Sequence, residues 1–245
     1  MNTVIFLPGI LLGRDCFIPI EKLFQASGFN TYIHSFPGYD GEARLPQETP
    51  SPEDYADDLY EKIKLLGKVH IFAHCSGCSP ALALALKYPD IISSITLVSY
   101  WHGTKEWESR KAVLIEGVEL YTRNRVPALI SSTDKEVVER VVKWLCAGLK
   151  DVEGFFQMAR SIAKFHVKET LNLVDVPLQF IVGGGDRVTS PEAQSSVAKN
   201  KCARLSIIPE GSHCMFFEDP LPSAEAALSF IRSLSIHPFA NANKG

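Results

Sequence analysis

The sequence predicts an α/β fold in which a mostly parallel central sheet is flanked by helices and carries an inserted helical cap. Three observations predict it. Short β-branched runs alternate with helical spacing over most of the 245 residues, as in βαβ units. One block, residues 103–170, has helical spacing and almost no strand signal. The length suits one α/β domain with an insertion better than two complete domains.

The division of the chain follows from that block. We expect residues 1–102 and 171–245 to form the core. Residues 103–170 are expected to form a cap, or lid, over the carboxyl edge of the sheet, where ligands bind in such folds.

The elements are expected in a regular order. The first run, TVIFL, ends at Pro8-Gly9, which stops a strand. Ser51 is expected to cap a helix with Pro52 in its first position, and another helix follows the turn near residue 75 and stops before Pro89. The expected strands are residues 3–7, 29–34, 68–73, 92–99, 176–182 and 204–208. The expected core helices cover residues 51–66, about 78–88, a stretch from about 190, and 223–234, before a frayed tail from 236.

Composition excludes several function classes. A net charge of −3 without blocks of like charge gives no electrostatic footprint for nucleic acid or an anionic membrane. No apolar stretch approaches the roughly 18 residues of a membrane span, and MNTVIFLPGI lacks the basic region of a signal peptide. Six scattered cysteines then predict free thiols in a cytoplasmic protein. We expect a monomer or homodimer with no nucleic-acid or membrane partner.

The stretch HIFAHCSGCSPALALALKYPD, residues 70–90, predicts a strand, a sharp turn and an apolar helix. Such a turn, a nucleophile elbow, needs small residues two positions before and after its apex. With Cys75 at the apex the flanks are Ala73 and Gly77, whereas Ser76 would have His74 and Cys78. Size therefore selects Cys75 as the nucleophile. The alternative is a structural turn in which Cys75 merely packs.

A nucleophile of this kind needs a base and an orienting carboxylate, in the chain order nucleophile, acid, base. His213 follows the last expected strand in a Gly-Ser turn, and Asp186 follows the strand before it. The oxyanion donors are expected to be the backbone N–H groups of Ser76 and Ile10, with Leu11 as the second choice to Ile10.

Five segments resemble the α/β-hydrolase superfamily, in particular its capped esterases, lactonases and thioesterases: VIFLPG, FPGYDGEA, VHIFAHCSGCSPALALALKYPD, DVPLQFIVGGGD and IPEGSHCMFFEDP. They span nearly the whole chain outside the cap. The chain departs from the usual pattern at three places: Pro8 replaces the histidine of His-Gly, Cys78 replaces a glycine, and Cys75 replaces the serine nucleophile. The resemblance implies an α/β-hydrolase fold with a Cys-His-Asp triad.

The resemblance implies hydrolysis of an ester, lactone or thioester, on a small-molecule or carrier-bound acyl substrate, in a natural-product pathway. A thioester at Cys75 is also open to other acceptors, so an acyltransferase or cyclase is an alternative, as is a lyase that eliminates an acyloxy group. Two further alternatives are a ligand receptor and a dithiol redox protein using Cys75-x-x-Cys78.

Tyr100 and Trp101 follow a core strand at the edge where substrates lie, and they are the expected pocket walls together with Leu11. No cofactor and no metal are expected. His213-Cys214 with Cys75 and Cys78 offers zinc-type ligands, but the triad pattern explains these residues better.

Overall fold

The computed structural model describes residues 2–100, 117–165, 167–200 and 203–236. A six-stranded sheet runs through its centre in the order β2-β1-β3-β4-β5-β6. Every pairing between these strands is parallel, so the expected mostly parallel sheet is wholly parallel over the described residues. The strands are β1 (Thr3–Leu7), β2 (Asn30–Ile33), β3 (Val69–His74), β4 (Ile92–Val98), β5 (Leu178–Gly183) and β6 (Arg204–Ile208).

Burial explains the strand sequences. β1, β3 and β5 are buried at every position, as expected for inner strands covered on both faces. The edge strand β2 instead alternates between exposed and half-buried positions. β1 and β6 have the bounds that their apolar runs predict, and the other strands differ from expectation by a few residues at their ends.

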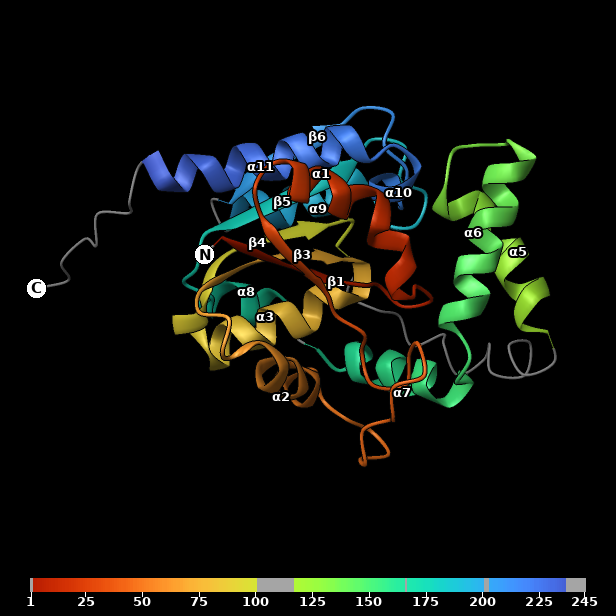
Figure 1. Ribbon diagram of the computed structural model, residues 1–245, viewed down its shortest axis with the longest axis horizontal. Coiled ribbons are helices and arrows are strands. Elements are labelled where there is room, and N and C mark those ends of the chain that lie inside the picture. The colour runs from red at the N-terminus through yellow and green to blue at the C-terminus, as the bar shows by residue number, and fades with distance from the viewer. Residues whose placement is uncertain (1, 101–116, 166, 201–202, 237–245) are drawn as a thin grey trace, which may run out of the picture.

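Helices cover both faces of the sheet (Figure 1). α1 and α11 lie together on one face, and α2 and α3 pack together on the other, while α9 packs along β5 and β6. The helices are α1 (Ile18–Ala26), α2 (Pro52–Ile63), α3 (Cys78–Lys87), α5 (Val118–Leu129), α6 (Lys135–Gly148), α7 (Val152–Ala163), α8 (Val167–Leu173), α9 (Pro191–Asn200), α10 (Met215–Glu218) and α11 (Pro220–Ile236). Short 3₁₀ turns cover η1 (Arg14–Phe17), η2 (Cys75–Gly77) and η3 (Pro89–Ile91).

The start of α2 agrees with the sequence signals. The Ser51 hydroxyl accepts a hydrogen bond from the Asp54 N–H, and the Asp54 carboxylate accepts one from the Ser51 N–H. This reciprocal pair is a capping box, and Pro52 takes the first helical position, where its missing N–H costs nothing.

Two helix predictions need correction. α1 was not expected, because Pro19 near its start and its short length conceal the four-residue spacing of its buried Ile20 and Phe24. α11 begins at Pro220 rather than Ser223, since a proline readily occupies a first helical turn.

The expected insertion is helical where it is described. Between β4 and β5 the structure contains α5, α6, α7 and α8, and residues 101–116 lie outside the described part. α5 and α6 stand side by side at one end of the molecule, beside the sheet (Figure 1).

The strand order places the site. The chain leaves β1 toward β2 on one side, and it leaves β3 toward β4 on the other. Ligands bind beyond the carboxyl ends of parallel strands at such a switch point. The β1–β3 register pairs Leu7 with Ala73, so the loop after β1 meets the turn after β3.

No helix in the described ranges combines the length and apolar character needed to cross a bilayer.

Candidate active site

Cys75 forms the apex of the turn between β3 and α3. Its φ is +51°, a left-handed conformation that is strained for a residue other than glycine, and this strain is typical of an elbow that presents a nucleophile. A Cβ added at Gly77 would fall 2.4 Å from the Pro8 carbonyl oxygen. Gly77 must therefore be small for two reasons. It lets the strand and the helix approach each other, as the sequence predicts, and it leaves room for the end of β1.

The structure brings Cys75, His213 and Asp186 together. The Nδ1 atom of His213 lies 3.0 Å and 3.1 Å from the two carboxylate oxygens of Asp186. Cys75 acts on His213 electrostatically, since its charge raises the pKa of that histidine. All three side chains are buried: Cys75 is 4% exposed and His213 is 2% exposed. This arrangement is compatible with the roles of nucleophile, base and orienting carboxylate that the sequence predicts.

The Asp186 carboxylate is held by its own loop. It accepts hydrogen bonds from the N–H groups of Val188 and Thr189 at 2.8 and 2.9 Å and from the Thr189 hydroxyl at 2.6 Å. Burial alone would raise the pKa of Asp186, but His213 and Thr189 outweigh it and hold that pKa well below its ordinary value. Asp186 therefore stays ionised, oriented toward His213.

The electrostatics of His213 follow from its two partners. Burial would lower its pKa, but the charges and hydrogen bonds of Cys75 and Asp186 raise the pKa of His213 from 6.5 to about 9. The imidazolium form is therefore favoured at neutral pH.

His74, the residue directly before Cys75, lies against His213. Its Nε2 is 3.0 Å from the backbone carbonyl oxygen of His213, and the two rings meet edge to face at 4.8 Å. Burial, assisted by the charge of His213, holds the pKa of His74 well below its ordinary value. His74 is therefore a neutral neighbour that braces the turn carrying His213.

The loop after β1 makes a tight turn in which the Leu12 N–H donates to the Gly9 carbonyl at 3.1 Å. Leu11, not Gly9, takes the left-handed position of this turn, with φ +76°. Gly9 is needed for close approach instead, because a Cβ there would lie 2.8 Å from the Cys75 Cβ. The Ile10 N–H donates to the Ser76 hydroxyl at 2.5 Å.

The expected pocket residues are only partly described. Tyr100 is buried beside Ser79 and near Cys75, and its N–H donates to the side chain of Gln194 at 2.8 Å. Leu11 is also buried. Trp101 lies outside the described residues.

The neighbouring thiols differ from Cys75. Cys78 is fully buried and its thiol donates to the Ala73 carbonyl at 3.3 Å. Burial, and then the charge of Cys75, raise the pKa of the Cys78 thiol, and burial likewise raises that of Cys214. In the part of the chain that the structure describes, no set of three or more His, Cys, Asp or Glu side chains is arranged to hold a metal ion.

The inserted helices are fastened to the loops that carry Asp186 and His213. The Leu129 carbonyl at the end of α5 accepts from the Cys214 N–H at 2.9 Å. The Pro127 carbonyl accepts from the Arg187 guanidinium at 3.1 Å. The insertion therefore touches the residues directly after the candidate acid and the candidate base.

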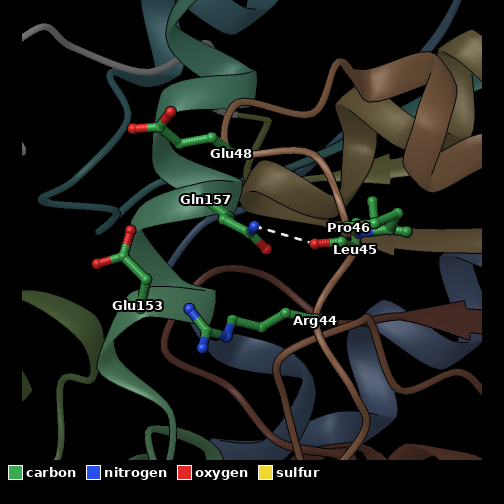
Figure 2. Close-up of a pocket in the computed structure, with 6 residues that line it drawn as sticks. All are labelled: Arg44, Leu45, Pro46, Glu48, Glu153 and Gln157. Atoms are coloured by element: carbon green, nitrogen blue, oxygen red, sulfur yellow. Dashed lines mark hydrogen bonds between the residues drawn. The ribbon is translucent and has the colours of Figure 1, made fainter.

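α7 is tied to another core loop (Figure 2). Its Gln157 side-chain N–H group donates to the carbonyls of Leu45 and Gln47 at 3.2 and 2.7 Å. A surface pocket lies there, lined by Arg44, Leu45, Pro46, Glu48, Glu153 and Gln157. None of these residues belongs to the Cys75 cluster, so this pocket is separate from it.

Sequence reasoning missed three features of the site: Thr189, the role of His74, and the Ser76 hydroxyl. A local signal existed only for Thr189, since Asp-x-x-Thr is a spacing at which a side chain bonds nearby backbone and hydroxyl groups. The other two contacts join residues far apart in the sequence.

Comparisons with known proteins give the same fold. A thermophilic esterase from Thermogutta terrifontis superposes with a TM-score of 0.83 at 20% identity, covering 96% of this chain and 90% of the other. The enol-lactonase from Burkholderia xenovorans LB400 gives a TM-score of 0.83 at 17% identity, covering 94% and 91%. Monoacylglycerol lipase ABHD6 of Rattus norvegicus is 20% identical over 95% of this chain and 76% of its own length.

The family model described as "Alpha/beta hydrolase family" matches residues 4–226, which is most of the sequence and includes both the elbow and the His213 turn. This chain therefore belongs to the alpha/beta hydrolase family.

Proposed function

We propose that the protein hydrolyses a carboxylic ester, lactone or thioester, with Cys75 as the nucleophile, His213 as the acid and base, and Asp186 as the residue that orients His213. The observation that carries the proposal is the set of three side chains. Cys75 stands at a strained apex and its charge raises the pKa of His213, and the Nδ1 atom of His213 lies 3.0 Å from the Asp186 carboxylate.

A thiolate mechanism suits this site. The proposal has Cys75 react as the thiolate while His213 holds the proton, and the raised pKa of His213, about 9, supports the imidazolium form. The N-terminal end of α3 lies just beyond Cys75 and favours negative charge there.

In the first half-reaction the thiolate sulfur of Cys75 bonds to the carbonyl carbon, and the carbonyl π electrons move onto oxygen. When the tetrahedral intermediate collapses, the bond from carbon to the leaving group breaks. His213 gives its proton to the departing alkoxide or thiolate, which leaves a thioester on Cys75 and a neutral imidazole.

In the second half-reaction His213 takes a proton from water, and the hydroxide oxygen bonds to the thioester carbon. The carbon–sulfur bond then breaks, which releases the acid and restores the ion pair. Asp186 stabilises the imidazolium at both stages. The backbone N–H groups of Ser76 and Ile10 are the proposed oxyanion donors.

The proposed substrate is a small or carrier-bound acyl compound with an apolar portion. Leu11 and Tyr100 are buried, and the charge of Cys75 acts on Tyr100. Both are proposed as pocket walls, and residues 103–170 are proposed as the lid. The structural neighbours named above include an esterase and an enol-lactonase.

The redox alternative finds less support. A reactive dithiol at a helix start uses thiols with a lowered pKa, whereas burial raises the pKa of Cys78. The same fact makes Cys78→Ala a good control.

The test compares Cys75→Ala with Cys78→Ala on p-nitrophenyl butyrate. The proposal predicts that Cys75→Ala loses at least about a thousandfold in kcat/KM, as removal of a triad nucleophile does. Cys78→Ala is predicted to keep kcat/KM within a few-fold. Equal activity of Cys75→Ala and the unmodified protein would refute the proposal.

A further inference from the structure

The oxyanion loop contains a hydrogen bond that ordinary oxyanion chemistry does not require. The Ile10 N–H donates to the Ser76 side-chain oxygen across 2.5 Å. Both residues are buried, with Ser76 only 1% exposed and Ile10 7% exposed. A donor expected to serve a reacting oxygen is thus engaged by the hydroxyl of the residue that follows the nucleophile.

We propose that the Ser76 hydroxyl is an internal occupant of the oxyanion hole, which the substrate carbonyl oxygen must displace from the Ile10 N–H before Cys75 is acylated. This inference rests on the proposed function, because it takes Cys75 as the nucleophile and Ile10 as an oxyanion donor.

The position of the hydroxyl supports displacement rather than sharing. An oxyanion donor works at about 2.7–3.1 Å from the reacting oxygen. The Ser76 oxygen already accepts the single hydrogen of the Ile10 N–H. A second oxygen along the same N–H would overlap with the Ser76 oxygen. The hydroxyl therefore turns away about its Cα–Cβ bond when a carbonyl enters.

The chemistry gives this occupant a function. The Ser76 hydroxyl and a ground-state carbonyl are both neutral acceptors, so their exchange at the Ile10 N–H is close to balanced. A developing oxyanion accepts a hydrogen bond about twice as strong as a neutral oxygen does. The transition state therefore offsets the cost of displacing the Ser76 hydroxyl more fully than the bound substrate does.

The strained backbone keeps the hydroxyl close to the loop. Cys75 has φ +51° and Gly77 packs against the Pro8 carbonyl, so Ser76 is held between two fixed neighbours. On the other side, Leu11 at φ +76° fixes the turn that presents Ile10. The pairing of Ser76 with Ile10 is thus set by two rigid turns.

The experiment compares Ser76→Ala with the unmodified protein, with Ser79→Ala as the matched control. Ser79 is a buried serine in the first turn of α3, three positions after Ser76, and its hydroxyl lies near Tyr100. Three quantities are measured for each: kcat/KM for p-nitrophenyl butyrate, the inhibition constant of butyraldehyde, and the rate of Cys75 alkylation by iodoacetamide.

The reagents separate the oxyanion hole from the thiol. Butyraldehyde forms a thiohemiacetal anion: the Cys75 thiolate sulfur bonds to the aldehyde carbon, the carbonyl π electrons move onto oxygen, and this oxyanion needs the hole while His213 keeps its proton. Iodoacetamide alkylates sulfur with loss of iodide and forms no oxyanion. Ser76→Ala is expected to raise kcat/KM and tighten butyraldehyde binding, each about tenfold, which corresponds to 1.4 kcal/mol. The alkylation rate and all three Ser79→Ala values are expected to stay within about twofold.

Several results overturn the inference. One is an unchanged or lowered kcat/KM in Ser76→Ala, and another is an alkylation rate that rises in step with kcat/KM. If iodoacetamide fails to modify Cys75 in the unmodified protein, the proposed function itself fails, so the two failures are distinguishable. A crystal structure of the unmodified protein with its butyraldehyde adduct gives a second reading that needs no variant. The inference requires the adduct oxygen on the Ile10 N–H and is wrong if Ser76 still occupies it.

Discussion

The side chain of His74 donates a hydrogen bond to the backbone carbonyl oxygen of His213 across 3.0 Å. A carbonyl oxygen only accepts, so the Nε2 atom of His74 carries the hydrogen, and the ring is neutral because its pKa is well below the ordinary value. His74 ends β3, directly before Cys75. One strand end therefore supplies the candidate nucleophile and also a support for the candidate base.

His74→Phe keeps the ring volume but leaves the buried His213 carbonyl without this donor. An unsatisfied buried group costs about 1–3 kcal/mol, and we expect roughly a tenfold lower kcat for p-nitrophenyl butyrate, with KM changed little. His70→Phe is the control, because His70 is a β3 histidine whose side chain bonds Ser94 at 2.8 Å instead. Equal losses in both variants would mean that His74 has no special relation to His213.

Gly9→Ala tests the contact between the loop after β1 and the elbow. The new Cβ would lie 2.7 Å from the His74 Nδ1 and 2.8 Å from the Cys75 Cβ, so one turn must shift. We expect kcat/KM to fall at least about a hundredfold, since displaced catalytic groups lose rate steeply. In Gly117→Ala the new Cβ would lie 3.5 Å from the Leu120 Cβ, an ordinary contact distance, and the variant is expected to be neutral. Full activity of Gly9→Ala would show that this approach is not needed.

The raised pKa of His213 predicts a pH window for stability. A group whose pKa is higher in the folded state stabilises the fold below its unfolded pKa, near 6.5, and that contribution is lost as pH rises through about 9. Thermal unfolding between pH 6 and 10 is expected to show a falling Tm across this window, and His213→Ala is expected to flatten the curve there. If Tm fell just as steeply with pH in His213→Ala, the pH dependence would belong to another titratable group.

Thr189→Val removes the hydroxyl that bonds the Asp186 carboxylate at 2.6 Å and keeps the side-chain shape. Without this hydrogen bond the pKa of Asp186 rises, and the carboxylate is held less firmly in its orientation toward His213. We expect about a tenfold lower kcat/KM, together with an acid limb of the pH–rate profile that moves to higher pH. A simple packing role would lower Tm without moving that limb.

The fate of the acyl group distinguishes hydrolysis from its alternatives. Reaction in ¹⁸O-labelled water is expected to place one labelled oxygen in the released acid, because the proposed mechanism has water attack a thioester on Cys75. Mass spectrometry of the acid reads this directly. An unlabelled acid with an unsaturated second product would indicate elimination, and an ester or amide product would indicate acyl transfer.

Local patterns sufficed for much of the fold. The run TVIFL before Pro8-Gly9 gave β1 its bounds, and Ser51 with Pro52 gave the start of α2, because strand stops and helix caps depend on neighbouring residues. α1 was missed because Pro19 and a short length hide its periodicity.

Some features of the candidate site could likewise be predicted from local sequence, and others could not. The identity of the apex residue follows from side-chain size, which the sequence contains: small residues flank Cys75, and the left-handed backbone is found there. The contacts of His74 with His213 and of Ile10 with Ser76 join residues 139 and 66 positions apart. Such contacts depend on how separate turns pack at the sheet edge, and no local pattern contains that information.

The most direct test of the central claim is peptide mass spectrometry of the unmodified protein quenched with acid during turnover of p-nitrophenyl butyrate. The proposed mechanism predicts a butyryl group on Cys75 that is absent from the Cys75→Ala protein. In His213→Ala the butyryl group is expected to accumulate where loss of His213 slows deacylation more than acylation. A butyryl group on Ser76 or Cys78, with Cys75 unmodified while ester is being cleaved, would contradict it.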